Sequence, residues 1–280
     1  MISGSHGRKL IRLALFGQPI KASLSPKIHR LFAAQFDLEI EFQRIETGTD
    51  GFPAALQAFR LAGGHGCNVT LPLKRDAWQL AADTSVDARQ AQSANTLLSQ
   101  AEGGWFAYNT DGAGLLADLT VNHDVNLAGL RILVLGAGGA VAGILGSLFA
   151  AGARQIVLVN RNLERARELA GRFGAKLDIT ATDWGSLPAS GSFDLLINAT
   201  SLGHQGDAPL LTQSLFADGS CLYDLNYYKA SLPLKKLCDE MDQTYIDGLG
   251  MLVEQAARSF YIWTGSKPDT CDVIDSCRAS

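Results

Sequence analysis

The chain of 280 residues has few charges, no paired cysteines and no long apolar run. Only 19% of its residues are charged and 47% are hydrophobic, which excludes an intrinsically disordered protein. The formal net charge is −4, so no basic excess favours binding to nucleic acid or to an anionic membrane. No apolar run is long enough to span a membrane, and residues 1–9 lack the apolar segment of a secretory signal.

Cysteine pairs are also absent, because the five cysteines are scattered and form no C-x-x-C motif. This spacing excludes a disulfide framework and a cysteine zinc site, and it predicts reduced thiols in a cytoplasmic protein. We find no cluster of metal-ligating residues and expect no metal. The cysteines are Cys67, Cys221, Cys238, Cys271 and Cys277.

The most informative segment is a glycine-rich turn that follows the apolar run 131–135. Residues 136–140 read Gly-Ala-Gly-Gly-Ala, and a helical pattern begins directly behind them. Glycines at such a turn let backbone N–H groups approach a pyrophosphate, and the N-terminus of the following helix favours its negative charge. A strict G-x-G-x-x-G motif has a third glycine where this chain has Val141, so a plain strand-to-helix turn remains an alternative.

The residues behind the next apolar run, 155–159, indicate which dinucleotide binds. Proteins that bind NAD through this fold place a carboxylate there to hold the ribose 2′-hydroxyl. This chain has Asn160 and Arg161 instead, with Arg165 one helical turn later. Guanidinium groups pair with a 2′-phosphate, so the sequence predicts NADP(H) rather than NAD.

Short apolar runs alternate with helical patterns, which in the second half predicts a parallel sheet with helices on both faces. The last helix has no strand after it and is expected to pack back on the first domain. Strands are expected at 10–16, 40–45, 67–70, 94–98, 105–108, 131–135, 156–160, 176–179, 193–198, 220–224 and 244–247. Helices are expected at 26–36, 53–62, 72–78, 111–120, 141–151, 163–173 and 251–263.

Polar side chains gather where strands of the first half end, which is where ligands of α/β sheets bind. Hydroxyls and amides at such positions suit a ligand with many hydroxyl groups. Each position also has a simpler interpretation. Ser25 is expected to cap the helix that begins at Pro26, and Asp111 is expected to cap the helix that comes after Thr110. These polar segments are 23–25, 68–74, 95–96 and 108–112.

Taken in order, these motifs resemble the shikimate dehydrogenase family over nearly the whole chain. The resemblance implies an α/β fold with an N-terminal α/β substrate domain and a Rossmann-type doubly wound NADP-binding domain. The active site would lie in the cleft between them. The substrate domain would span 1–110, completed by C-terminal helices in 248–280, and the NADP domain 111–247. The matching segments are 18–29, 68–74, 94–96, 109–112, 136–140, 160–161, 198–203, 247–255 and 263–265, with Phe260.

The resemblance also implies the reaction, the reversible NADPH-dependent reduction of 3-dehydroshikimate to shikimate in aromatic amino acid biosynthesis. Lys74 and Asp111 would be the catalytic pair. The substrate residues would be Ser23, Ser25, Thr70, Asn95 and Gln255. The cofactor residues would be Gly136, Ala137, Gly138, Gly139, Ala140, Asn160, Arg161, Asn162, Arg165, Leu225, Tyr227 and Gly248.

Hydride addition to a carbonyl develops negative charge on its oxygen, and a nearby cation must stabilise that charge. We therefore expect Lys74 to act mainly as a charged hydrogen-bond donor that Asp111 orients. Two alternatives remain, a quinate/shikimate dehydrogenase of broader specificity and a catalytically silent NADP-binding sensor. The chain departs from the family at Ala22, at 92–94 and at His204, and the expected assembly is a monomer or a homodimer.

Overall fold

The structure is a computed structural model that describes residues 10–174 and 177–279. The chain forms two compact units, the first made of Met1–Thr110 and Gln255–Ser280 and the second of Asp111–Glu254. In the described ranges, no helix combines the length and the apolar character needed to cross a membrane.

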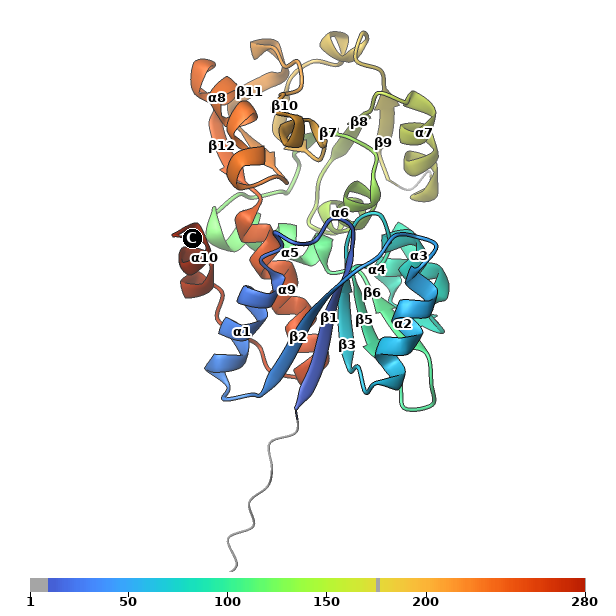
Figure 1. Cartoon of the computed structure of the whole chain (residues 1–280). Helices are drawn as coiled ribbons and strands as arrows, with labels where there is room; N and C mark the ends of the chain where they lie inside the picture. Colours follow the sequence, from blue (N-terminus) through green and yellow to red (C-terminus); the bar gives the residue numbers. More distant parts are fainter. Residues whose placement is uncertain (1–9, 175–176, 280) are drawn as a thin grey trace, which may run out of the picture. The chain divides into compact units, whose positions relative to one another are not determined.

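The first unit is built on a mixed six-stranded sheet with the order β2-β1-β3-β5-β6-β4 (Figure 1). β5 runs antiparallel to both β3 and β6, whereas β1 is parallel to β2 and β3. The turn from β5 to β6 uses Gly103 and Gly104 at φ +98° and +85°, a backbone conformation that favours glycine. The strands are β1 (Ile11–Gly17), β2 (Ile40–Glu46), β3 (Gly66–Val69), β4 (Asp83–Thr84), β5 (Thr96–Ser99) and β6 (Trp105–Tyr108).

Aromatic side chains form two groups in the core of the first unit. One group joins Phe16 of β1 to helix α2, where the ring of Phe52 lies 5.5 Å from that of Phe16. A second group joins helices α1 and α9, where the rings of Phe32 and Phe260 are 5.6 Å apart. The helices are α1 (Ser25–Gln35), α2 (Phe52–Leu61), α3 (Lys74–Leu80), α4 (Val86–Ala91), α10 (Cys271–Arg278) and the part of α9 (Leu249–Thr264) that begins at Gln255.

Helix α9 returns the end of the chain to the first sheet, as the sequence predicts. The Nε1 atom of Trp263 donates a hydrogen bond of 3.0 Å to the Leu97 carbonyl oxygen in β5. Gly66 of β3 makes room for this indole, because a Cβ atom at Gly66 would lie 2.3 Å from the same Nε1 atom. The backbone of β3 and the indole therefore pack in direct contact.

The second unit is built on a parallel six-stranded sheet with the order β12-β11-β10-β7-β8-β9. If the strands are numbered 1 to 6 along the chain, starting at β7, the sheet reads 3-2-1-4-5-6 from its β9 edge. This is the strand order of dinucleotide-binding sheets. The strands are β7 (Arg131–Leu135), β8 (Gln155–Val159), β9 (Ile179–Thr182), β10 (Phe193–Asn198), β11 (Phe216–Asp224) and β12 (Thr244–Asp247). The helices are α5 (Asp111–Ala117), the π-helix Asp118–Asn122, α6 (Gly139–Ala150), α7 (Leu163–Arg172), α8 (Leu232–Glu240) and the short turns Leu187–Ser190, Leu202–Gln205, Gln213–Leu215 and Tyr228–Ala230.

Several expected element boundaries are wrong. The strand expected at 176–179 begins at Ile179, because Ile179 is the residue that pairs with Ile156 of β8; residue 176 itself lies outside the described range. The helix expected at 111–120 is α-helical only to Ala117 and continues as a π-helix. The sequence patterns did not reveal β4, α4, α8 and α10, of which β4 has only two residues and α4 only six.

Candidate active site

The glycine turn joins β7 to α6, with Gly138 as the residue that precedes the helix. Gly136 has φ +120°, and a Cβ atom there would lie 3.1 Å from the Ala199 carbonyl oxygen. A Cβ atom at Gly138 would meet no atom within 4 Å. Gly136 is therefore required by the turn itself, whereas Gly138 leaves open space beside a helix N-terminus. This arrangement fits the pyrophosphate of a dinucleotide.

The third glycine of the motif usually allows close packing of helix on strand, whereas the close approach at Gly112 is between the two helices α5 and α6. A Cβ atom at Gly112 would lie 2.1 Å from Ser147 Oγ and 2.7 Å from the Gly143 carbonyl oxygen, both in α6. Val141, in the place of the third glycine, is fully buried. The departure at Val141 therefore removes no feature that the turn needs.

The segment behind β8 places two arginines at the surface of the second unit. Asn162 precedes α7, and its Oδ1 accepts a hydrogen bond of 3.2 Å from the Arg165 backbone N–H. Asn160 donates through Nδ2 to the Asn162 carbonyl oxygen at 2.9 Å. Within the described residues, no carboxylate forms an ion pair with Arg161 or Arg165. The nearby Glu164 is instead paired with Arg167 at 2.6 Å, so the two guanidinium groups fit a 2′-phosphate.

Leu225 and Gly248 come together where β11 and β12 end. The Leu225 N–H donates to the Asn198 carbonyl oxygen at 2.8 Å, and the Gly248 N–H donates to the Asn226 carbonyl oxygen at 3.0 Å. A Cβ atom at Gly248 would lie 2.4 Å from the Leu225 carbonyl oxygen, so only glycine fits there. Tyr227 is partly exposed in the following turn.

In the first unit, the two serines form a local hydrogen-bonded pair in front of α1. Ser23 Oγ lies 3.2 Å from Ser25 Oγ and accepts a hydrogen bond of 3.3 Å from the Ser25 N–H. The expectation that Ser25 caps this helix is wrong, since Leu24 occupies the N-cap position and Ser25 is the first helical residue. The Ser25 hydroxyl therefore does not serve as the cap of α1.

Thr70 lies next to the end of β1, and Lys74 follows it at the start of α3. The Thr70 N–H donates to the Phe16 carbonyl oxygen at 2.9 Å. A Cβ atom at Gly17 would lie 2.4 Å from Thr70 Cγ2, so glycine is needed for this approach. Lys74 is the first residue of α3, and its carbonyl oxygen accepts a hydrogen bond of 2.8 Å from the Ala94 N–H. The residue next to Ala94 is Asn95, so three predicted site residues lie in one region.

Asn95 and Gln255 are brought together although 160 positions separate them. The Nδ2 atom of Asn95 donates to Gln255 Oε1 at 3.2 Å and to Thr110 Oγ1 at 2.9 Å. Its Oδ1 atom accepts a hydrogen bond of 2.8 Å from the Thr110 N–H. Gln255 belongs to the part of α9 that packs on the first unit, which explains how these distant residues meet.

Three further residues support this pair: Asn68 and Thr96, from the polar segments singled out in the sequence, and Ser259, which the sequence patterns did not indicate. Asn68 of β3 donates through Nδ2 to Ser259 Oγ at 3.1 Å and to Thr96 Oγ1 at 3.2 Å. Thr96 Oγ1 and Ser259 Oγ are 2.7 Å apart. Ser259 is one helical turn after Gln255, and this i, i+4 spacing on one face of α9 is the signal that could have found it.

Asp111 begins α5 in the second unit and is 5% exposed. It follows Thr110, the last residue of this part of the first unit, directly in the chain. Lys74 belongs to the first unit, so the pairing of Lys74 with Asp111 stays a prediction.

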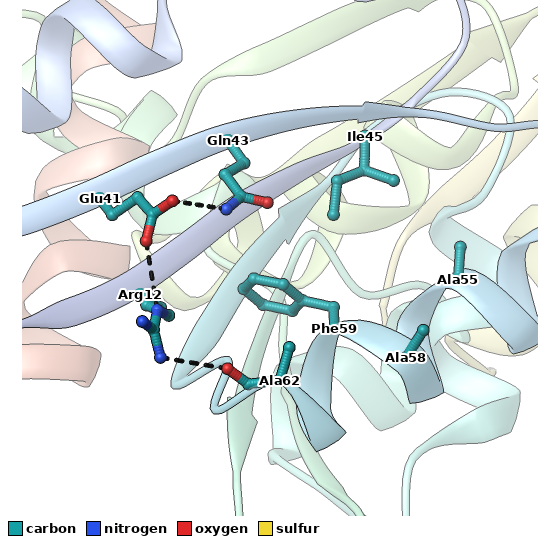
Figure 2. A pocket seen from close by; sticks show the side chains of 8 residues that line it. All are labelled: Arg12, Glu41, Gln43, Ile45, Ala55, Ala58, Phe59 and Ala62. Carbon is teal, nitrogen blue, oxygen red and sulfur yellow. Dashed lines mark hydrogen bonds and ion pairs between the residues drawn. The ribbon is translucent and has the colours of Figure 1, made fainter.

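A cavity of about 550 Å³ on the first unit lies away from all the predicted site residues. Figure 2 shows its polar side, where Glu41 accepts hydrogen bonds from Arg12 at 3.2 Å and from Gln43 at 2.7 Å. These hydrogen bonds, that from Gln43 first, hold the pKa of Glu41 below its usual value. Apolar groups of β2 and α2 form most of the rest of the lining. Its lining residues are Arg12, Glu41, Gln43, Ile45, Ala55, Ala58, Phe59 and Ala62.

The cysteines and possible metal ligands give no second site. None of the five cysteines, all of which lie in the described ranges, forms a disulfide. Burial raises the pKa of the Cys67 thiol, and it raises that of Cys221 to about 11, so both are poor nucleophiles. Over the described residues, no group of three His, Cys, Asp or Glu side chains could hold a metal ion.

Comparison with known families covers most of the chain. Residues 15–97 match the shikimate dehydrogenase substrate binding domain, 116–216 the shikimate / quinate 5-dehydrogenase family and 248–274 the shikimate 5′-dehydrogenase C-terminal domain. A protein of Xylella fastidiosa (strain Temecula1 / ATCC 700964) named shikimate dehydrogenase (NADP(+)) is 44% identical over 92% of this chain and 93% of its own length.

The chain belongs to the shikimate dehydrogenase family.

Solved structures agree with the expected two-domain α/β fold. An Ael1 enzyme from Pseudomonas putida has a TM-score of 0.88 at 38% identity, over 95% of this chain and 97% of that one. Shikimate 5-dehydrogenase from Thermus thermophilus, solved with NADP(H) and shikimate, has a TM-score of 0.81 at 30% identity, over 96% and 99% of the two chains. Membership of the shikimate dehydrogenase family and its Rossmann-type domain are thus confirmed, as the sequence motifs predict.

Proposed function

We propose that this protein catalyses the reversible NADP-dependent interconversion of shikimate and 3-dehydroshikimate. The observation that carries the proposal is the meeting of Asn95 and Gln255 in the first unit, in hydrogen bonds of 3.2 Å and shorter around Thr110. This buried set of neutral donors and acceptors suits a ring that carries several hydroxyl groups. Family membership supports the same reaction.

The first unit binds the substrate. Ser23 and Ser25 bind its carboxylate through their paired hydroxyls, and Thr70, Asn95 and Gln255 bind its ring hydroxyls. The carboxamide of Asn95 is held on both of its polar atoms, so it is oriented before the substrate arrives. Preorganised donors lower the entropic cost of binding and of the reaction.

Lys74 and Asp111 carry the reaction at the carbonyl. NADP(H) supplies or accepts the hydride. The Lys74 ammonium donates a hydrogen bond to the oxygen on which negative charge develops and delivers its proton there. Asp111 orients the Lys74 ammonium and accepts a hydrogen bond from a neighbouring ring hydroxyl.

The second unit binds NADP(H). Backbone groups of Gly136, Ala137, Gly138, Gly139 and Ala140 hold the pyrophosphate, for which Gly138 leaves open space. Arg161 and Arg165 pair with the 2′-phosphate, supported by Asn160 and Asn162. Leu225, Tyr227 and Gly248 surround the nicotinamide.

We further propose that the enzyme works in the cytoplasm as a monomer or a homodimer. Free cysteines fit a reducing compartment. Its binding partner is the small-molecule substrate, shikimate or 3-dehydroshikimate, and neither nucleic acid nor a membrane is part of its function.

Initial rates of NADP⁺ reduction with shikimate, measured beside quinate and beside NAD⁺, test the proposal. Turnover confined to shikimate with NADP⁺ would support it. Comparable rates with quinate or NAD⁺ would replace it with a quinate/shikimate dehydrogenase of broader specificity. NADP⁺ binding without turnover on either acid would make the protein a silent sensor and contradict the proposed reaction.

A further inference from the structure

Asp224, the last residue of β11, is a buried carboxylate surrounded by neutral hydrogen-bond donors. It is 1% exposed. Its Oδ1 atom accepts hydrogen bonds from Asn198 Nδ2 at 2.8 Å, from the Asn226 N–H at 3.0 Å and from Asn226 Nδ2 at 2.9 Å. Its Oδ2 atom accepts one from the Tyr245 hydroxyl at 3.1 Å. Four donors on two oxygens are a set that suits the ionised carboxylate.

No cation in the described part of the chain forms a salt bridge with this buried carboxylate. Burial raises the pKa of Asp224 above the usual value, while hydrogen bonds from Asn226, Asn198 and Tyr245 lower it. A buried charge without a cation is costly, and a well-packed neutral side chain is often as stable at such a position. The presence of a carboxylate at this buried position is therefore not explained by a gain in folding stability.

The hydrogen bonds of Asp224 join the ends of the neighbouring strands β10 and β11 to each other and to a residue within β12. Asn198 ends β10, and its Oδ1 accepts hydrogen bonds from the Thr200 N–H at 3.1 Å and from Thr200 Oγ1 at 2.8 Å. Asn226 follows β11 and donates through Nδ2 to the Thr200 carbonyl oxygen at 3.1 Å. Tyr245 belongs to β12. One carboxylate thus sets the shape of the turn 198–200 and of the turn 224–226.

The strand order places these turns at one half of the dinucleotide site. A dinucleotide lies across the carboxyl ends of such a sheet, with one mononucleotide on each side of the first strand, here β7. Arg161 follows β8, on one side of β7, whereas β10, β11 and β12 lie on the other side. In the proposed function Arg161 binds the adenosine 2′-phosphate. The nicotinamide half of the cofactor therefore lies on the other side of β7, beside the turns that are hydrogen-bonded to Asp224.

We propose that Asp224 is a positioning residue for the nicotinamide half of NADP(H). It holds the turns behind β10 and β11 in the one arrangement that receives this half, and it takes no part in binding the adenosine half. The inference rests on the proposed function, because it assumes that the second unit binds NADP(H).

Replacement of Asp224 by Asn tests the inference without any turnover. The change is nearly isosteric, but it replaces one carboxylate oxygen, which accepts hydrogen bonds, with an amide N–H₂ group, which donates them. At least one of the four donors that now contact the two oxygens of Asp224 then loses its acceptor. The dissociation constants of NADP⁺ and of adenosine 2′,5′-bisphosphate, which lacks the nicotinamide half, are measured by titration calorimetry. We expect D224N to weaken NADP⁺ binding by about tenfold or more, as for a lost charged hydrogen bond. Binding of the bisphosphate is expected to stay within about twofold.

Two control variants separate positioning from general damage. Arg161→Ala is expected to weaken both ligands, because both carry the 2′-phosphate. Asp118→Asn is the matched structural control, since Asp118 is also a carboxylate at 1% exposure in the second unit and accepts hydrogen bonds from Tyr223 and Asn122. It is expected to lower the melting temperature while the ratio of the two dissociation constants stays that of the wild type.

If D224N does not fold, Tyr245→Phe removes the hydrogen bond to Oδ2, together with the one of 3.3 Å to the Ser231 carbonyl oxygen, and leaves the other three donors of Asp224 in place. It is expected to weaken NADP⁺ selectively by a smaller factor. Equal weakening of both ligands in the folded variant, or unchanged NADP⁺ binding, would overturn the positioning role while leaving the proposed function intact. A wild-type protein that binds neither ligand would instead overturn the proposed function, and this inference with it.

Discussion

His29 of α1 and Asn68 of β3 share a buried hydrogen bond, with 3.0 Å between His29 Nε2 and Asn68 Oδ1. Because the other amide atom of Asn68 donates to Ser259 and Thr96, its Oδ1 faces the imidazole and His29 is the donor. The ring is stacked on Phe42 with centroids 4.8 Å apart. Within the described chain its Nδ1 atom has no hydrogen-bond partner. The neutral imidazole is thus part of the polar network that reaches Asn95.

Burial lowers the pKa of His29 from 6.5 to about 4, partly offset by the hydrogen bond to Asn68. Between these values the unfolded chain binds a proton that the folded protein does not, so the free energy of unfolding falls as pH decreases. The stabilisation is complete above pH 6.5 and lost by about pH 4. A shift of this size corresponds to about 3 kcal/mol. Urea unfolding at pH 7, 6, 5 and 4 measures it.

His29→Gln is the control for this pH dependence, because glutamine can still donate to Asn68 and does not titrate. The slope of the free energy of unfolding against pH is expected to differ between the wild type and the variant only between about pH 4 and pH 6.5. These are the pKa values of His29 in the folded and the unfolded protein. Parallel stability curves for the two proteins would show that His29 does not titrate as its burial requires.

Replacement by alanine is expected to reduce the stability of the protein much more at Gly136 than at Gly138, the two glycines at the ends of the Gly-Ala-Gly turn. Gly136→Ala forces φ +120° on an L residue and brings a methyl within 3.1 Å of the Ala199 carbonyl oxygen. It should lower the free energy of unfolding by about 1–3 kcal/mol. Gly138→Ala has φ −93° and open space, so its cost should stay below about 1 kcal/mol.

The same Gly138→Ala variant should lose NADP⁺ affinity, because its methyl fills the space proposed for the pyrophosphate. We expect a loss of about tenfold or more, equivalent to about 1.4 kcal/mol. Thermal denaturation and NADP⁺ titration on the same preparations separate the two effects. Full NADP⁺ affinity in Gly138→Ala would contradict the assignment of this turn.

Arg161→Ala is expected to reduce the preference for NADP⁺ over NAD⁺. Loss of a charged hydrogen bond to the 2′-phosphate costs about 1.5–3 kcal/mol, or about 10- to 150-fold in the ratio of kcat/KM values for the two cofactors. Arg167→Ala, in the helix α7 that follows Arg161, is the matched control, because Arg167 is already paired with Glu164 at 2.6 Å. An unchanged ratio in Arg161→Ala, or an equal effect in Arg167→Ala, would remove the basis for this role.

Lys74→Ala is expected to lower kcat by about 100- to 1000-fold, the usual effect of removing a group that stabilises a developing oxyanion. KM for shikimate should change far less, because the residues proposed to bind its carboxylate and ring hydroxyls, among them Ser23, Asn95 and Gln255, are unchanged. Steady-state kinetics at saturating NADP⁺ measures both constants. A variant with unchanged kcat and a raised KM would make Lys74 a binding residue only.

Local patterns in the sequence predicted the candidate site segments whose residues are neighbours in the chain, and the roles of these residues stay predictions. The glycine turn, the Asn160–Arg161 segment and the two serines before α1 each depend on a few consecutive residues, and the structure places each where a strand ends or a helix begins. The exact cap of α1 was wrong, because residue preference favours serine while the chain path places Leu24 there.

Only the tertiary structure decided how residues distant in the chain meet. Asn95 contacts Gln255, 160 positions away, because the end of α9 packs on the first sheet through Trp263. Asp224 meets Asn198 and Tyr245 because the sheet order puts β10, β11 and β12 side by side. Periodicity specifies which face of a helix or strand is buried, but hydrogen bonds near 3 Å depend on which elements pack together.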